Sequence, residues 1–97
     1  MRYSLEFRES VGDYLRQLPL SRTARVKLNT RLIALTAEVP DSFRSDPENR
    51  PEPTSRFYHF TYLFRDANRS CTLYVVVDDS SAAYGVMSIV YVDCQIG

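Results

Sequence analysis

The chain is poor in the residues that build metal, redox and disulfide sites. It has no tryptophan, one histidine, three glycines and two cysteines among 97 residues. Cys71 and Cys94 are too few for a disulfide-stapled scaffold, their spacing is not that of a metal knuckle, and one histidine cannot complete a zinc site with them. We therefore expect no metal and no cofactor, and the sequence does not say whether either thiol reacts.

Long apolar runs are also missing. No stretch approaches the ~20 apolar residues that cross a bilayer. The first ten residues, MRYSLEFRES, alternate charged and apolar side chains where a signal peptide would have an apolar segment. This pattern predicts a cytoplasmic protein without membrane contact. With 44% hydrophobic and 25% charged residues, the composition is typical of one globular domain over residues 1–97.

Lysine is nearly absent, although the formal net charge is zero. Of the 12 basic residues only Lys27 is not arginine. Arginine pairs with phosphates and carboxylates through a planar fork, so the bias suits an anionic partner, whereas GC-rich coding DNA would produce it without any function. The acid-free stretch 22–31 is either a solvated helix face or a surface for an acidic partner. Its basic residues are Arg22, Arg25, Lys27 and Arg31.

A strand and a short helix are predicted at the start of the chain. Residues 2–8 alternate polar and apolar side chains with the period of a half-buried strand. Apolar residues between 11 and 18 recur at helical spacing, with Ser10 and Asp13 placed to cap the helix start and Pro19 after its end.

A second helix is predicted to begin at a cap, Ser21, and to carry an apolar stripe as far as Val39, where Pro40 ends it. Residues 40–55 hold four prolines and one large apolar residue, Phe43, which predicts neither helix nor strand. This segment is either a lid or docking loop anchored by Phe43 or a tolerated insertion.

The C-terminal part predicts a meander of three strands. Residues 56–64 place four aromatic rings on one side, which we interpret as a core face, with base stacking as the alternative. Residues 71–79 are apolar on both sides, which predicts a central strand covered on both faces. Residues 83–93 complete the meander, with Gly85 as a bulge or close-approach point. The four rings are Tyr58, Phe60, Tyr62 and Phe64.

The predicted order is β-α-α-β-β-β, an α+β fold in which a helical hairpin packs on a four-stranded, mostly antiparallel sheet. This order, the opening Y-x-L-x-F strand, the arginine-rich second helix and the segment LYVVVDDSSAAYGVMSIV resemble the RelE/ParE superfamily of bacterial type II toxins over nearly the whole chain. The resemblance implies a cytoplasmic toxin that a cognate antitoxin neutralises by wrapping its surface. RelE-type members cleave mRNA in the ribosomal A site, whereas ParE-type members act against DNA gyrase.

Metal-free RNA cleavage requires a proton acceptor, cations around the phosphorane and a proton donor. RelE relatives supply these mainly from lysines and arginines on the last three strands, where this chain has His59 and Thr61, Cys71, and Val92 or Asp93. Most of the RelE catalytic set is therefore not matched. His59 is left as base or acid, with arginines to hold phosphate. The catalytic candidates are Arg56, His59, Arg65, Arg69 and Tyr91.

Two functions of different class remain open. One is a ribosome-dependent, metal-independent mRNA endonuclease, which requires His59 and the arginines to replace the usual cations. The other is a non-catalytic module, either a ParE-like gyrase inhibitor or a degenerate relative that binds only its antitoxin, and the missing cations favour it. A stand-alone regulatory protein is a third possibility. We expect the antitoxin to lie as an amphipathic helix or extended segment across the sheet and hairpin, with acids against Arg22, Arg25 and Arg31.

Overall fold

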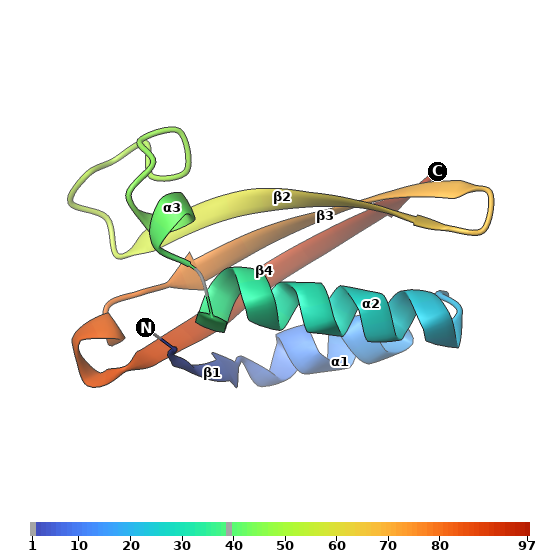
Figure 1. The fold of residues 1–97 in the computed structure, drawn as a ribbon, viewed down its shortest axis with the longest axis horizontal. Helices are drawn as coiled ribbons and strands as arrows, with labels where there is room; N and C mark the ends of the chain where they lie inside the picture. The colour runs from blue at the N-terminus through green and yellow to red at the C-terminus, as the bar shows by residue number, and fades with distance from the viewer. Residues whose placement is uncertain (1, 39) are drawn as a thin grey trace.

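In the computed structural model, which describes residues 2–38 and 40–97, the chain forms a four-stranded mixed sheet and several helices. The α+β prediction is confirmed at this level. Along the chain the elements are β1 (Ser4–Phe7), α1 (Glu9–Gln17), α2 (Arg22–Ile33), a π-helical turn (Ala34–Glu38), α3 (Asp41–Arg44), β2 (Phe57–Asp66), β3 (Arg69–Asp78), a 3-10 turn (Ala82–Tyr84) and β4 (Val86–Ile96) (Figure 1).

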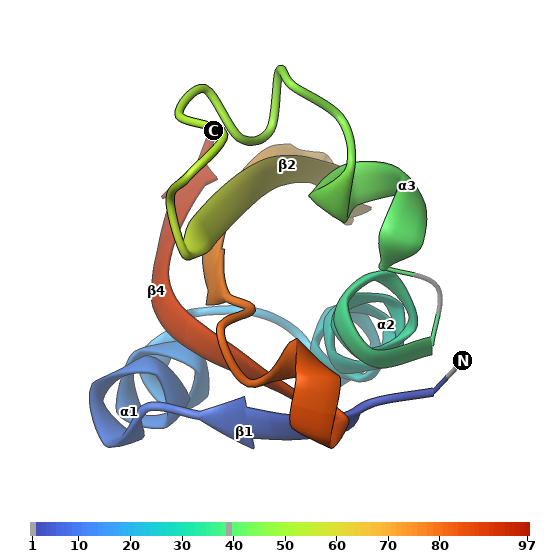
Figure 2. The ribbon, with the colours of Figure 1, turned by 90° about the vertical axis from the view of Figure 1, so that its left-hand side faces the viewer.

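The strands lie in the order β1-β4-β3-β2. β1 runs parallel to β4, and the two other pairs are antiparallel. The β2–β3 hairpin keeps an unbroken register from Phe57 opposite Asp78 to Asp66 opposite Arg69. The sheet curls strongly, with α2 on its concave side (Figure 2).

The core lies between α2 and the concave side of the sheet. Alternate residues of β3 are at most 1% exposed, and they belong to one apolar cluster with Leu28 and Leu32 of α2. The other side of β3 is only half-buried at Tyr74 and Val76, so the prediction of a strand covered on both faces is wrong. Valine and tyrosine are tolerated on that open face because their cross-strand neighbours shield them in part. The buried β3 residues are Cys71, Leu73, Val75 and Val77.

Helix α2 begins as predicted, because the Ser21 hydroxyl accepts a hydrogen bond from the Ala24 amide at 3.2 Å. The helix ends at Ile33, and a π-helical turn follows it. The predicted stripe residue Val39 lies outside the described residues. Pro40 is the N-cap of the four-residue helix α3, so the prediction of no helix in residues 40–55 is wrong for its first turn.

Helix α1 does not begin as predicted and does not cover the face of the sheet. Arg8 is its N-cap residue and makes no side-chain cap, so Ser10 lies inside the helix. The helix instead packs along β4 beyond the point where the short strand β1 ends (Figure 2). There the Tyr14 hydroxyl accepts from the Cys94 amide at 2.8 Å and donates to the Cys94 carbonyl at 3.5 Å. These bonds satisfy backbone groups at an edge that would otherwise be open.

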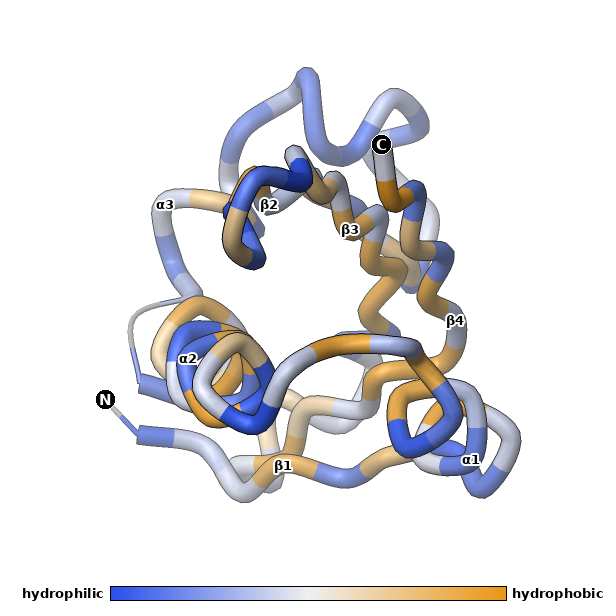
Figure 3. Tube along the Cα trace, turned by 90° about the vertical axis from the view of Figure 1, so that its right-hand side faces the viewer, coloured by the Kyte–Doolittle hydropathy of each residue, from blue (hydrophilic) through white to orange (hydrophobic). Residues whose placement is uncertain are grey.

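Within the strands that the structure describes, the sheet has one register shift, and it lies at a place other than the predicted one. Gly85 has a φ of 77° and closes the 3-10 turn before β4, so it is not a bulge within the strand. The register between β3 and β4 shifts between Val76 and Val77, which leaves Val90 as the extra residue on β4. Apolar residues concentrate along β3 and β4, while the loop after α3 is mostly polar (Figure 3).

Replacing Tyr14 with Phe should lower the free energy of unfolding by about 1 kcal/mol, because the Cys94 amide loses its acceptor at the sheet edge. Urea denaturation measures the change. Tyr84→Phe is the matched control, since Tyr84 is 86% exposed. Equal stability of Tyr14→Phe and the wild type would contradict the edge-capping role.

Candidate functional site

Two of the three predicted catalytic or phosphate-binding arginines form ion pairs with aspartates. Arg56 donates from Nε to Asp78 at 3.0 Å and lies over the Phe57 ring at 5.2 Å from its centroid. Arg69 donates to Asp66 at 2.8 Å. Because each guanidinium already faces a carboxylate, neither offers an unpaired charge to a phosphate.

The structure does not gather the catalytic candidates around His59. His59 is half-buried on the outer side of β2, and its ring lies 5.6 Å from that of Tyr74. Tyr91 is on the same side of the sheet, 6.2 Å from Tyr74. Arg65 is exposed but six residues further along β2, which is roughly 20 Å from His59. His59 therefore has aromatic neighbours and no converging cations among the described residues.

The four aromatic rings predicted on one side of β2 do point to the core. Tyr58 and Phe60 are 0% and 3% exposed, which confirms core packing and leaves these two rings no surface for stacking bases. The aromatic face open to a partner is the opposite one, with His59, Tyr74 and Tyr91 in a row. Tyr74 is not among the sequence candidates, although its place between the buried residues Leu73 and Val75 in an alternating strand indicates the outer side.

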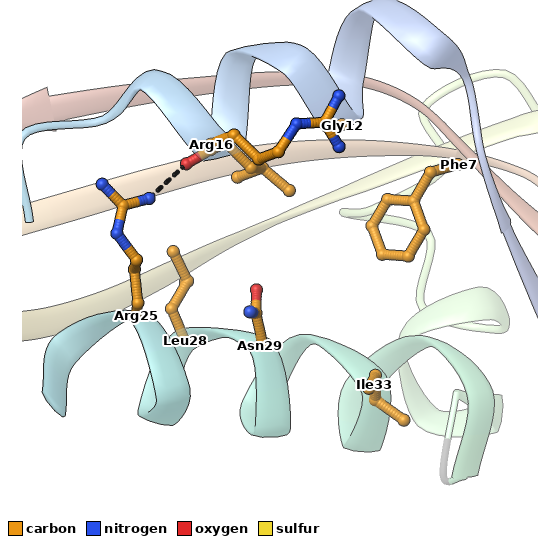
Figure 4. A pocket seen from close by; sticks show the side chains of 8 residues that line it. Phe7, Gly12, Arg16, Arg25, Leu28, Asn29 and Ile33 are labelled. Atoms are coloured by element: carbon orange, nitrogen blue, oxygen red, sulfur yellow. Dashed lines mark hydrogen bonds between the residues drawn. The ribbon is translucent and has the colours of Figure 1, made fainter. Parts of the chain in front are cut away.

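A groove runs between α1 and α2, and we call it the α1–α2 groove. Its volume is about 430 Å³, and the side chains of both helices and of the end of β1 line it (Figure 4). Phe7 and Ile33, 42% and 36% exposed, lie at one end and Arg25 lies at the other, while the Arg16 side chain extends along the α1 wall to Gly12 (Figure 4). A second recess, between β1 and the end of α2, shares Phe7 and Ile33, so the groove continues along β1. The lining residues of the first part are Phe7, Gly12, Leu15, Arg16, Arg25, Leu28, Asn29 and Ile33.

The basic residues of α2 differ in their contacts. Arg22, Lys27 and Arg31 are exposed and form no ion pair among the described residues. Arg25 instead donates to the Leu15 carbonyl at 2.9 Å, and also to the Leu18 carbonyl (Figure 4). It thus caps the C-terminus of α1 and spans the groove.

Residues 40–55 are fastened to the sheet. Arg44 and Arg50 both pair with Asp79, and Arg44 does so from Nε at 3.1 Å. The Phe43 ring lies 5.0 Å from that of Phe60, so Phe43 packs the segment against β2, as one of the two alternatives for residues 40–55 requires, while the lid or docking role stays a prediction. The Tyr58 hydroxyl is buried without a hydrogen-bond partner among the described residues.

None of the helices within residues 2–38 and 40–97 combines the length and apolarity needed to span a membrane. In the same described ranges, no group of three or more His, Cys, Asp or Glu side chains is placed to hold a metal ion.

Replacing Tyr58 with Phe should raise the free energy of unfolding by about 1 kcal/mol, because it removes a buried hydroxyl that has no partner. Burial also raises the pKa of Tyr58 far above its usual value, so the group stays a neutral, unpaired donor. Tyr3→Phe is the matched control, since the Tyr3 hydroxyl accepts from Arg44 at 3.0 Å and its loss should destabilise. Urea denaturation measures the change in the free energy of unfolding of each variant, which should be positive for Tyr58→Phe and negative for Tyr3→Phe. A destabilised Tyr58→Phe would contradict the prediction.

Acid should unfold the protein in part through Asp66. Hydrogen bonds from the Ser21 hydroxyl and amide, at 2.7 and 2.9 Å, hold the pKa of the Asp66 carboxyl below its usual value. Its stabilising contribution is therefore present above the unfolded pKa of about 3.9 and is lost as the pH falls through the lower folded pKa. In urea denaturation at decreasing pH, the free energy of unfolding of Asp66→Asn should fall less steeply than that of the wild type. The same pH dependence in both proteins would contradict this role of Asp66.

Comparison of the chain with known protein families, with curated proteins and with solved structures finds no match. The function must therefore follow from the geometry of the α1–α2 groove and of the outer sheet face.

Proposed function

We propose that this protein is the toxin-like component of a bacterial type II toxin–antitoxin pair, of RelE/ParE type, and that it acts by binding a macromolecular target and not by cutting RNA. The observation that carries the proposal is the α1–α2 groove, a mainly apolar groove to which α1 contributes Arg16 and α2 contributes Arg25. An acidic, amphipathic segment of an antitoxin is the partner that this chemistry fits.

Burial of the apolar part of the groove would stabilise a complex. Phe7 and Ile33 expose apolar surface that water contacts in the free protein. Burying such surface releases about 25 cal/mol for each Å² removed from water. An amphipathic helix presents apolar side chains at a spacing that fills a groove between two helices.

The positive charge of α2 favours a negatively charged partner. No acidic residue occurs anywhere in α2, and Arg22, Lys27 and Arg31 are exposed on it. None of these three cations lines the α1–α2 groove, so they attract an acidic partner at longer range, which speeds association and disfavours basic partners. Binding should therefore weaken as salt is added.

The surroundings of His59 argue against RNA cleavage. A phosphorane needs preorganised cations, and the absence of one such group typically costs about 3 kcal/mol in the barrier. Arg56 is bound to Asp78, and Arg65 lies at the far end of the strand. The row of His59, Tyr74 and Tyr91 offers a partly exposed aromatic surface, which suits binding of a large partner such as gyrase or the ribosome.

Expression of the chain in a bacterial host tests the proposal. We expect growth arrest with intact mRNA at ribosomal A sites, and rescue by the acidic product of the adjoining reading frame at the native locus. Ile33→Asp should keep the arrest but escape rescue, with antitoxin affinity about tenfold lower or more, because it adds an acid to the groove. A gyrase supercoiling assay with the purified protein then separates a gyrase target from others.

Val26→Asp is the matched control. Val26 is 58% exposed on the same helix and does not line the groove, so Val26→Asp adds the same charge to α2 without changing the groove lining. Rescue that is lost equally in both variants would contradict the groove as the antitoxin site. A-site mRNA cuts that disappear in His59→Ala would replace the binding proposal with the endonuclease.

A further inference from the structure

The two outer edges of the sheet differ in how far other parts of the chain cover them. β1 is only four residues long, and beyond it α1 covers the edge of β4 through Tyr14. β2 forms the opposite edge and is ten residues long. Among the described residues, backbone hydrogen bonds cover only its beginning, since the His59 amide donates to the Asn49 carbonyl at 2.9 Å and the Phe57 amide donates to the Ser55 hydroxyl at 3.1 Å.

The covered amides fix which backbone groups of β2 point outward. In an antiparallel ladder the N–H and C=O of one residue face the neighbouring strand, and those of the next residue face away. His59 faces away from β3, and the β2–β3 register contains no shift. Thr61, Leu63 and Arg65 therefore also face away, and within the described chain their outward amides and carbonyls have no partner.

This free edge lacks the usual protection against pairing. Natural edge strands carry proline, lysine, bulges or inward charges. Residues 61–65, with the sequence TYLFR, contain none of these and end in one arginine. Leu63 is 72% exposed at the centre of the segment.

We propose that residues 61–65 of β2 pair antiparallel with the same residues of a second copy of the chain, about a two-fold axis at Leu63. In this register Leu63 lies opposite Leu63 of the second copy, and Thr61 lies opposite Arg65. All three outward residues of each copy then donate and accept one backbone hydrogen bond. The two sheets join into one continuous sheet.

Several features favour a second copy as the occupant. The symmetric register places no like charges opposite each other, because Arg65 faces a threonine. The net charge of the chain is zero, so no overall repulsion opposes self-association. On the concave side Tyr62 and Phe64, half-buried and stacked at 5.6 Å, would meet Phe64 and Tyr62 of the second copy and lose exposed surface.

Neighbouring segments limit the length of the pairing. Asn49 occupies the outward amide of His59, and the β2–β3 turn follows Asp66. The interface is therefore restricted to five residues in each copy, and an interface this small predicts a weak, reversible dimer. This inference goes beyond the proposed function and does not depend on it.

Sedimentation velocity of the full chain from roughly 5 to 500 µM tests the proposal, since weak dimers dissociate in this range. We expect a monomer–dimer equilibrium. Leu63→Arg should lower the association constant about tenfold or more, because it places like charges opposite each other at the axis. Tyr84→Arg is the matched control, since it adds the same charge at a side chain 86% exposed in the turn before β4.

Amide hydrogen exchange identifies the surface. The amides of Thr61, Leu63 and Arg65 should exchange more slowly as the concentration rises, while those of Tyr62 and Phe64 stay protected by β3 at all concentrations. A wild type that remains monomeric throughout overturns the proposal. So does a dimer that Leu63→Arg leaves intact, or one in which the exchange of the three outward amides is independent of concentration.

Discussion

One helix closes the concave side of the curled sheet, and the other elements take their places from that contact. Leu28 and Leu32 of α2 are 2% exposed and share a cluster with fully buried Leu73 and Val75 of β3. Burial of each such side chain contributes roughly 2 kcal/mol. Both ends of the helical segment are tied to the sheet region, by Ser21 bound to Asp66 at the start and by the Tyr3 amide donating to Ala37 at the end.

Closure of the core leaves three aspartates in places of low exposure, and arginines neutralise them. The side chains of Asp66, Asp78 and Asp79 are 7% to 10% exposed, and each forms an ion pair with at least one guanidinium. A carboxylate with so little exposed surface is unfavourable unless it is paired and hydrogen-bonded. Arginines that pair with these aspartates in the folded protein are therefore not free to bind a phosphate. Four of the eleven arginines, Arg44, Arg50, Arg56 and Arg69, have this structural role.

The sequence predicts those features that local spacing determines. The two-residue period in residues 56–64 identifies both the strand and its core face, and Ser21 marks the start of α2. It does not predict that Arg56 meets Asp78, because that pair forms only when β2 and β3 align. The sequence also does not predict that Tyr14 covers the edge of β4, because Tyr14 and its partner Cys94 are 80 residues apart in the chain. Apolar residues on both sides of β3 suggest double cover, whereas the outer face of this small sheet stays open.

Arg25 illustrates how folding and binding share one side chain. The basic run in α2 makes it a predicted contact for an acidic partner, yet its guanidinium donates to the carbonyls of Leu15 and Leu18 on the opposite wall of the α1–α2 groove. These bonds fix the distance between the two helices and satisfy carbonyls at the end of α1 that would otherwise face water. A groove held at one width binds with less loss of conformational entropy than two helices that must be ordered by the partner. Arg25 therefore supports binding by shaping the groove, and the charge that selects the partner comes from the exposed cations of the same helix.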